Sequence, residues 1–191
     1  MVPIQITQPT ELLEAALLTS RTLITSPVIA AVFGERQQRM DAAVKLAFER
    51  LSCRIYAAKD DGRIVAAMRV TESPTCFPAS MERLRLLPSL LALDGSLRNF
   101  VKWQKAWEQH DPKEPHLHIS SLAVLPEKQK QGVGRQLVDH FCNLADSKSL
   151  AGYLETDRKE NVSYYERFGF ELVGEGAILN QQNWFMLRPR R

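Results

Sequence analysis

The segment HLHISSLAVLPEKQKQGVGRQLVDHFCNL, residues 116–144, decides the fold of this chain. Residues 116–125 are rich in β-branched and apolar side chains, which is typical of a buried strand. Apolar residues then recur at helical spacing on one face: Val133, Leu137, Phe141 and Leu144. The segment therefore predicts a strand, a tight turn that contains glycine, and a helix.

The turn at residues 129–134 has the properties of an anion-binding site. Its backbone N–H groups stand at the positive end of the dipole of the following helix. Gly132 and Gly134 lack the Cβ atoms that would keep a ligand away from the backbone. Positive side chains surround the turn: Lys128, Lys130 and Arg135. We expect this turn to bind a phosphate or a pyrophosphate.

Two common phosphate-binding motifs do not fit the turn. A Walker loop requires Gly-Lys-Ser/Thr at its end, whereas Arg135 and Gln136 follow Gly134. A Rossmann fingerprint requires a third glycine at the position where Leu137 stands. The glycine pair must therefore be interpreted within a longer pattern.

Length and composition exclude several classes of protein. The 191 residues, 45% of them hydrophobic, suffice for one well-packed domain and are few for two. A formal net charge of +3 is too small to indicate nucleic-acid binding. We predict no membrane span, because the apolar run at residues 86–93 is short, and no signal peptide. Three cysteines without ligand spacing indicate reduced thiols in a cytoplasmic protein: Cys53, Cys76 and Cys142.

The N-terminal third alternates strands and helices. Residues 4–7 predict a strand, and Thr10 is the expected cap of a helix over residues 11–18. Because Pro27 interrupts the next stretch, residues 20–34 are expected to form a loop or a short broken helix. A longer helix over residues 35–51 should bury one face: Met40, Val44, Ala47, Phe48 and Leu51.

Strong turn signals mark a hairpin in the middle of the chain. Two alternating runs, residues 54–59 and 63–71, flank Asp60-Asp61-Gly62, and Asp-Gly is a strong hairpin signal. The next stretch, residues 72–115, is rich in proline, with helical patterns at residues 80–87 and 97–110.

The second of these helices carries three aromatic residues on one face: Phe100, Trp103 and Trp107. We favour the interpretation that this face packs on the sheet. The alternative is that it forms a wall of a substrate pocket.

The C-terminal part predicts a strand over residues 152–157 and a helix over residues 161–168. Asn161 is the expected cap of that helix, and Gly169 the left-handed residue that ends it. Two further strands are predicted over residues 170–174 and 184–187. Strands separated by helices, with hairpins at both ends, indicate a mixed α/β fold.

Two motifs resemble those of the GNAT superfamily of N-acetyltransferases. The first is Leu-x-Val-x-Pro-x-x-Gln-x-x-Gly-x-Gly, formed by residues 122–134, which is similar to the acetyl-CoA motif of the family. The second, Asn-Val-Ser-Tyr-Tyr-Glu-Arg-Phe-Gly-Phe at residues 161–170, is similar to a segment that supplies a tyrosine to the site. With Leu154-Glu155-Thr156 before it, this string resembles the puromycin acetyltransferase branch. The resemblance covers residues 115–188 well and residues 53–71 loosely.

The resemblance implies a single GNAT acyl-CoA N-acyltransferase domain over residues 1–191. Its α/β fold would have a mixed, mostly antiparallel sheet that splays at the central strand near Val124, with helices on both sides. Residues 72–115 would be a helical insertion.

By the same resemblance, acetyl-CoA is the co-substrate and a primary amine of a small molecule the acceptor. The pantetheine arm would pair with Leu122, Ala123 and Val124. The pyrophosphate would lie on the turn, formed by Gln129, Lys130, Gln131, Gly132, Val133, Gly134 and Arg135. Asn161, one helical turn before Tyr165 on the same face, could also contact the cofactor. Many relatives have Gln-Gly-Lys-Gly before the last glycine, while this chain has Gln-Lys-Gln-Gly, which changes a side-chain contact but leaves the backbone donors.

The resemblance makes Tyr165 the acid that protonates the departing thiolate, a task for which a phenol is suited. An amine nucleophile also requires a base, and His118 stands eleven residues before Gln129, where several relatives have a glutamate. His116 lies on the same face of the strand. Glu155 is the other candidate and could position the amine. His116 and Glu155 are thus candidate substrate contacts.

Alternatives to these roles remain open in the sequence. His118 could be a hydrogen-bonded core residue, or half of a two-histidine metal site with His116. We predict no metal, because no further Cys, His or carboxylate stands at ligand spacing. The function could instead be that of a non-catalytic acyl-CoA sensor, or of a protein or peptide N-acetyltransferase. Neither a nucleic-acid nor a membrane partner is expected, and the oligomeric state is open, a homodimer included.

Overall fold

The computed structural model describes residues 3–34, 36–50, 53–76 and 95–191. Within them the chain forms a seven-stranded sheet in the order β1-β2-β3-β4-β5-β7-β6. All neighbouring strands are antiparallel except β4 and β5, which are parallel. The strands are β1 (Ile4–Ile6), β2 (Arg54–Asp60), β3 (Arg63–Glu72), β4 (His116–Val124), β5 (Ala151–Thr156), β6 (Glu171–Ile178) and β7 (Gln181–Arg188). The mixed, mostly antiparallel sheet predicted from the sequence is confirmed.

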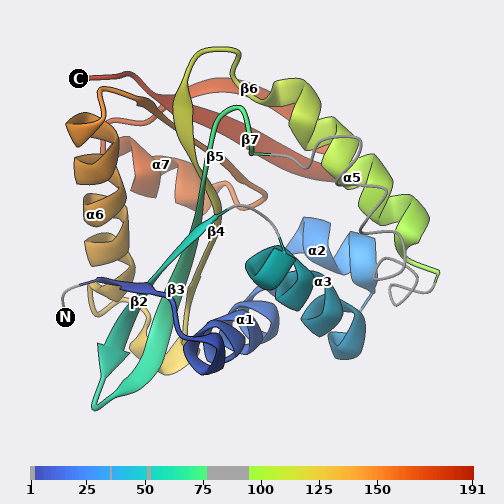
Figure 1. Cartoon of the computed structure of the whole chain (residues 1–191). Helices are drawn as coiled ribbons and strands as arrows, with labels where there is room; N and C mark the ends of the chain where they lie inside the picture. Colours follow the sequence, from blue (N-terminus) through green and yellow to red (C-terminus); the bar gives the residue numbers. More distant parts are fainter. Residues whose placement is uncertain (1–2, 35, 51–52, 77–94) are drawn as a thin grey trace.

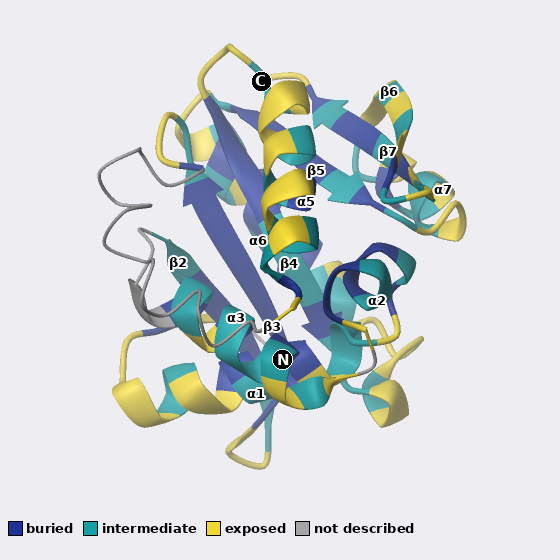
Figure 2. Ribbon diagram, turned by 90° about the vertical axis from the view of Figure 1, so that its right-hand side faces the viewer, coloured by how far each residue is buried: buried dark blue, intermediate teal, exposed yellow. Residues whose placement is uncertain are grey.

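Helices cover both faces of this sheet. They are α1 (Pro9–Leu23), α2 (Pro27–Phe33), α3 (Gln37–Arg50), α5 (Leu97–His110), α6 (Val133–Ser147), α7 (Glu160–Glu166) and the short 3₁₀ helix η2 (Pro126–Lys128). Figure 1 shows α6 and α7 on one side of the sheet and the other four α-helices on the opposite side. Figure 2 shows mostly buried strands in the middle of the molecule, while the outer face of α5 is exposed.

Each face of the sheet carries its own hydrophobic cluster. Ile55 and Ala57 of β2 belong to the cluster beneath α1, α2, α3 and α5, whereas Tyr56 and Ala58 belong to the one beneath α6 and α7. This alternation follows from the two-residue period of a strand. The second cluster also contains the apolar stripe of α6, whose Leu137, Val138, Phe141 and Ala145 are fully buried.

The central strand β4 contains an irregularity that opens the sheet. Val70 of β3 pairs with Ile119 and the preceding Arg69 with Ser121, so Ser120 is an extra residue in this register. Such a bulge bends a strand and increases its twist. The pairing of β4 with β5 ends at the same place, with Ile119 opposite Leu154. The two strands therefore part after Ile119, whereas the sequence predicted that they part near Val124, five residues later.

The N-terminal helices differ from the prediction. The first begins at Pro9 with Gln8 at its N-cap, so the predicted cap at Thr10 is wrong, and it continues to Leu23. Proline suits the first turn of a helix, where its missing N–H costs nothing. Thr19 and Ser20 remain helical because their hydroxyls donate to carbonyls of the preceding turn.

Pro27 begins a helix rather than breaking one. It is the first residue of α2, after Ser26 at the N-cap position. The carboxylate of Asp157, directly after β5, accepts hydrogen bonds from the Ser26 hydroxyl and from the Val28 N–H at 2.8 Å. A carboxylate far away in sequence thus satisfies the start of α2, and this could not be predicted from local patterns.

Several other predicted elements are confirmed. The hairpin turns at Asp61-Gly62, both with positive φ, and α5 spans the predicted 97–110. The last two strands are longer than predicted and are joined by Leu179 and Asn180, again with positive φ. Gly169 is left-handed, as expected, with a φ of 83°. The predicted helix at residues 80–87 and the predicted core residue Leu51 lie outside the described residues.

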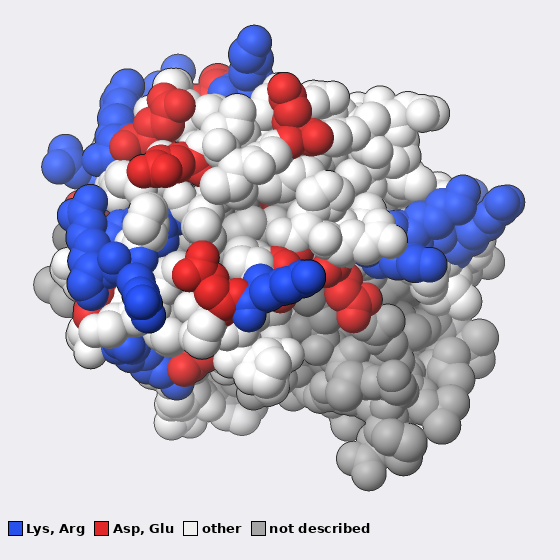
Figure 3. All heavy atoms as spheres, turned by 90° about the horizontal axis from the view of Figure 1, so that it is seen from above, with Lys and Arg blue, Asp and Glu red and all other residues white. Residues whose placement is uncertain are grey.

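Two global properties concern the length of the helices and the distribution of charge. No single helix in the described residues is long and apolar enough to span a membrane; α1 and α2 together meet the length and composition criteria but are bent by 102°. In Figure 3 basic side chains gather along the left edge and in a separate group at the right of the face shown, with acidic side chains and an uncharged area between the two groups.

A buried arginine fastens β7 to the helices on one face. The Arg188 guanidinium donates to both carboxylate oxygens of Asp146 on α6, at 2.7 and 2.8 Å, and its Nε donates to the Phe168 carbonyl at 3.0 Å. Only 2% of Arg188 is exposed. Its hydrogen bonds hold the pKa of Asp146 below the usual range.

We predict that Asp146→Asn lowers the free energy of unfolding by about 1–3 kcal/mol, because a buried guanidinium loses its charged partner. Asp139 on the same helix is the matched control, since it pairs with Arg135 on an exposed surface. Asp139→Asn should change stability by less than about 0.5 kcal/mol. Urea denaturation of both variants provides the measurement, and equal effects would refute the role of Arg188.

Candidate active site

A cavity of about 850 Å³ opens where β4 and β5 part. Its lining from β4 is residues 118–122, and its lining from β5 and the following turn is residues 154–158. Helix α7 contributes Asn161 and Tyr165. Most of the remaining lining is apolar and comes from α1, α2, α3 and α5. The cavity thus combines a polar end at the open sheet with a large apolar wall.

The open edge of β4 supplies unpaired backbone groups to this region. Leu122, Ala123 and Val124 pair with β3 on one side, through Met68, Ala67 and Ala66. On the other side the described residues form no pairing with β5 beyond Ile119. An extended ligand can therefore hydrogen-bond along this edge as an additional strand would.

The glycine turn after β4 has the predicted form. Lys130 and Gly132 have positive φ values of 59° and 82°, and Gly132 is the N-cap of α6. The cap has no side-chain hydrogen bond, and helical bonding begins with the Gln136 N–H. The N–H groups of Val133, Gly134 and Arg135 therefore remain free for an anion at the positive end of a 15-residue helix.

The side chains around the turn mainly fix its shape. Gln129 donates to the Val124 carbonyl at 3.0 Å, and Gln131 donates to the Glu127 carbonyl at 2.7 Å. Lys128 pairs with Asp60 of the hairpin. Arg135 forms an exposed pair with Asp139 at 3.5 Å. The structure thus makes the backbone, more than these side chains, the candidate anion site.

Gly134 lies where α6 meets its neighbours. A Cβ atom built there would lie 3.4 Å from Cγ2 of Val124 and 3.6 Å from the Tyr164 hydroxyl, which are ordinary van der Waals distances. The packing of α6 against the end of β4 would therefore accept a methyl group at this position but leaves little room for a longer side chain directed the same way.

Helix α7 directs Tyr165 and Asn161 toward the cavity. Tyr165 is buried, and burial raises the pKa of its phenol above the ordinary value, so the group keeps its proton. The prediction that Asn161 caps α7 is wrong, because Lys159 occupies the N-cap position. Instead the Asn161 amide donates to the Thr156 hydroxyl at 3.0 Å and ties α7 to the end of β5. Tyr164 packs against Phe168 and Gly134.

His118 and Glu155 form a buried pair at the polar end of the cavity. Nε2 of His118 lies 2.7 Å from Oε2 of Glu155, and both side chains are almost fully buried. Burial opposes a charge on His118, but the Glu155 carboxylate outweighs it and raises the pKa of His118 to about 9. The other carboxylate oxygen, Oε1 of Glu155, has no hydrogen-bond partner within the described residues. Glu155 can therefore accept a hydrogen bond from a ligand.

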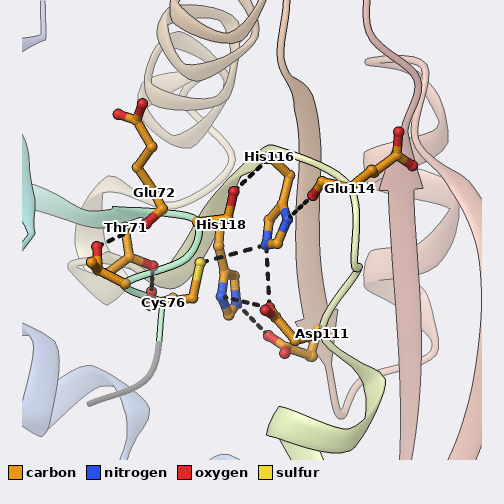
Figure 4. A network of polar contacts seen from close by, with 11 residues as sticks. Thr71, Glu72, Cys76, Asp111, Glu114, His116 and His118 are labelled. Atoms are coloured by element: carbon orange, nitrogen blue, oxygen red, sulfur yellow. Dashed lines mark hydrogen bonds and ion pairs between the residues drawn. The ribbon is translucent and has the colours of Figure 1, made fainter. Parts of the chain in front are cut away.

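Behind this pair lies a second cluster, which sequence analysis missed. Nε2 of His116 lies 3.2 Å from Oδ1 of Asp111 and 3.5 Å from Sγ of Cys76 (Figure 4). Burial opposes the charge on each group, but these contacts raise the pKa of His116 to about 10 and lower that of Cys76 to about 7. His116 is fully buried and is not part of the cavity lining, so its predicted contact with substrate is not supported.

The signals for this second cluster in the sequence were weak. Asp111 stands five residues before His116, at the end of the predicted helix, and this proximity was the available clue. Cys76 is forty residues away, and no spacing pointed to it. Cys142 lies on α6 away from the cavity, as predicted, and burial raises the pKa of its thiol to about 11.

Two further parts of the lining set the character of the cavity. Phe100, Trp103 and Trp107 of α5 line it, and Trp103 is also buried in the core, so both interpretations of this aromatic face hold. Arg69, 7% exposed, also lines the cavity, and its Nε has no hydrogen-bond partner within the described residues. The cavity can therefore receive a largely apolar molecule with charged groups at one end.

Comparison with known proteins gives consistent results. The curated peptidyl-lysine N-acetyltransferase YjaB of Salmonella typhimurium is 28% identical over 61 residues, 32% of this chain and 41% of that relative. The chain thus matches about two fifths of the length of the curated relative.

Among solved structures, a histone acetyltransferase HPA2 and related acetyltransferase from Corynebacterium glutamicum superposes with a TM-score of 0.74. It is 17% identical, with 100% of this chain and 98% of that chain covered. The Drosophila melanogaster polyamine N-acetyltransferase superposes with a TM-score of 0.66 at 13% identity, with 97% and 98% covered. At these identities the likeness shows the fold alone.

The model of the acetyltransferase (GNAT) family matches residues 27–170, well over half of the chain. The matched range contains the bulged β4, the glycine turn, Glu155 and Tyr165. The chain therefore belongs to the acetyltransferase (GNAT) family.

Proposed function

We propose that this chain transfers the acetyl group of acetyl-CoA to a primary amine of a small molecule by direct attack. Members of the GNAT family use acetyl-CoA as co-substrate. One observation carries the proposal: Leu122, where the open edge of β4 begins, lines the same cavity as Tyr165 and Glu155. These are the groups that a thioester aminolysis requires, namely a binding edge, an acid and a group that receives the amine.

The residues present fit acetyl-CoA. The free N–H groups at the start of α6 suit the pyrophosphate, and the unpaired edge at Leu122, Ala123 and Val124 suits the pantetheine amides. Bound in this way, the co-substrate supplies an activated acetyl thioester at the parting of β4 and β5. The polar end of the cavity lies at the same place, with Asn161 and Tyr165 above it.

Tyr165 is the proposed acid. Its phenol is buried and protonated, so it can protonate the thiolate that leaves when the tetrahedral intermediate collapses. Nothing in this step requires a covalent enzyme intermediate, because the amine attacks the thioester directly.

Glu155 is the proposed receiver of the acceptor amine. Its Oε1 lacks a partner within the described residues, and an ammonium group would satisfy it. We assign proton acceptance to Glu155 rather than to His118, which the sequence favoured, because Nε2 of His118 is already bonded to Glu155. His118 is then a positioning residue that holds the carboxylate in the cavity.

The apolar wall favours a small acceptor over a peptide. Phe100, Trp103 and Trp107 line the same cavity as Glu155, and this aromatic surface suits an aryl or alkyl amine. Arg69 adds a positive group, so an amine that also carries a carboxylate would satisfy both charges. The resemblance to the puromycin acetyltransferase branch, a prediction from the sequence, agrees with a small acceptor. The local similarity to a peptidyl-lysine N-acetyltransferase favours a second candidate, acetylation of lysine side chains.

Gly134→Glu should abolish binding of acetyl-CoA, because a side chain and a negative charge enter the anion site together. A carboxylate in the first turn favours the helix itself, so the fold should persist. Thermal unfolding with and without acetyl-CoA measures the effect. Asn143→Glu, which adds the same charge to an exposed position on α6, is the matched control and should keep the stabilisation by acetyl-CoA. Full stabilisation of Gly134→Glu would refute this placement of the co-substrate.

Tyr165→Phe should lower kcat by ~10²-fold or more, the usual contribution of one acid group, with little change in affinity for acetyl-CoA. Tyr164→Phe, on the adjacent residue, is the control and should keep kcat within a few-fold of the parent. Release of free thiol measures turnover, and isothermal titration measures affinity. Unchanged turnover in Tyr165→Phe would show that Tyr165 is not the acid and would leave it a packing residue, whereas absence of turnover in the parent would favour a non-catalytic acyl-CoA sensor.

An acceptor screen that reads thiol release should separate the two classes of substrate. We expect turnover with arylalkylamines and aromatic amino acids and little with lysine-containing peptides. Glu155→Gln should lower kcat/KM for the best amine by ~10²-fold, because the amide keeps the shape but not the charge. Turnover with peptides alone would overturn the assignment of a small acceptor and establish the lysine acetyltransferase.

A further inference from the structure

Four side chains with metal-binding atoms converge at the polar end of the cavity: Cys76, Asp111, His116 and His118. Cys76 and His118 belong to the cavity lining, whereas Asp111 and His116 do not. They come from three segments, because Cys76 follows β3, Asp111 ends α5, and both histidines lie on β4. In Figure 4 the four side chains are directed toward one another. The potential ligand atoms of Cys76, Asp111 and His118 all lie within 4.8 Å of one another.

The separations resemble the edges of a zinc tetrahedron. With Zn–S near 2.3 Å and Zn–N or Zn–O near 2.0–2.1 Å, sulfur and nitrogen ligands lie about 3.5 Å apart, and nitrogen and oxygen ligands about 3.3 Å apart. Here Sγ of Cys76 lies 3.5 Å from Nε2 of His116, and that nitrogen lies 3.2 Å from Oδ1 of Asp111. Nδ1 of His118 lies 4.0 Å from the same Oδ1. Small side-chain rotations would therefore bring all four atoms onto one ion.

The outer nitrogen of each imidazole is already held. Nδ1 of His116 lies 2.8 Å from the Glu114 carbonyl, and Nε2 of His118 lies 2.7 Å from the Glu155 carboxylate. Histidines that bind metals almost always donate their other N–H to a backbone carbonyl or a carboxylate, which fixes the tautomer and the ring orientation. Both rings therefore present an inner nitrogen to the cluster.

The donor set and its burial select the metal. One thiolate, two imidazoles and one carboxylate suit zinc, whereas magnesium and calcium prefer oxygen ligands. Thiolate and carboxylate together neutralise a divalent ion. Both histidines are nearly inaccessible, and Cys76 is 7% exposed, so four protein ligands leave no open position for a reactant. Such a closed set is typical of a structural site.

We propose that Cys76, Asp111, His116 and His118 bind a structural zinc ion, which fastens the end of α5 and the segment after β3 to the central strand. This departs from the sequence-based expectation of no metal, which relied on ligand spacing along the chain. The ion would lie behind the Glu155–His118 pair and would fix the aromatic wall that α5 contributes to the cavity.

Zinc binding to the full chain, first stripped with a chelator, tests the proposal. Titration with Zn²⁺ against a chromophoric chelator should give one tight site per chain, and thermal unfolding should shift upward with Zn²⁺ but not with Mg²⁺ or Ca²⁺. Cys76→Ser and Asp111→Asn should each weaken the affinity by roughly 100-fold or more. Glu155→Gln, which loosens His118, should weaken it by roughly 10–100-fold.

Cys142→Ser is the matched control, because Cys142 is also a buried cysteine but lies on α6 outside the cluster. It should bind Zn²⁺ like the parent. Substitution by Co²⁺ adds a spectroscopic readout, since a thiolate ligand gives a near-ultraviolet charge-transfer band that Cys76→Ser should remove and Cys142→Ser should retain. Far-ultraviolet circular dichroism and stabilisation by acetyl-CoA show that each variant is folded.

Two results would overturn the proposal. The first is a parent protein that binds no Zn²⁺ more tightly than the competing chelator and shows no thermal shift. The second is a folded Cys76→Ser variant that keeps the affinity and the cobalt band of the parent. Either result would make the four side chains a hydrogen-bonded network alone.

Discussion

The bulge at Ser120 is the constraint on which the rest of the structure depends. Up to Ile119 the central strand is paired on both sides, and beyond it β4 keeps only its partner β3. A sheet cannot leave a row of backbone donors and acceptors unpaired inside the molecule without a large cost in free energy. The open edge is sustainable because it faces a cavity that solvent or a ligand can fill. The cavity, the candidate co-substrate edge and the position of Glu155 all follow from this interruption.

Much of the fold was predictable from local patterns in the sequence. The parts of the candidate site that follow from such patterns, the glycine turn and the helix that carries Tyr165, were predictable as well. The period of β4, the Asp-Gly hairpin and the apolar stripe of α6 each follow from short-range chemistry, and all three are confirmed. The resemblance to the family located the glycine turn and placed Tyr165 on a helix. The start of α1 was missed because Thr10 was interpreted as its cap, and the start of α2 because Pro27 was interpreted as a breaker, although proline also suits the first turn of a helix.

What the sequence could not supply was contact between distant segments. Asp157 completes the start of α2 from 129 residues away, and Cys76 meets His116 across forty residues. Periodicity carries no information about such encounters. For the same reason, the sequence identified the pair of histidines but missed the thiol and the carboxylate that the fold brings to them. Both acidic groups of this region, the partly buried Asp111 and the almost fully buried side chain of Glu155, lie against imidazoles that offset the cost of desolvating them.

The contacts that cross the parting of the sheet have a thermodynamic consequence. Asp157, directly after β5, accepts a hydrogen bond from the start of α2. The ring of His110, at the end of α5, stacks on the ring of Phe185 of β7, with 3.8 Å between the two ring centroids. Elements from the two halves of the sheet are therefore fastened to each other across the gap. The conformational entropy lost in fixing the width of this gap is lost when the chain folds. It is not lost again each time a ligand binds. A molecule that enters the cavity then gives up its own freedom of motion but need not order the protein, so more of its contact energy remains as affinity.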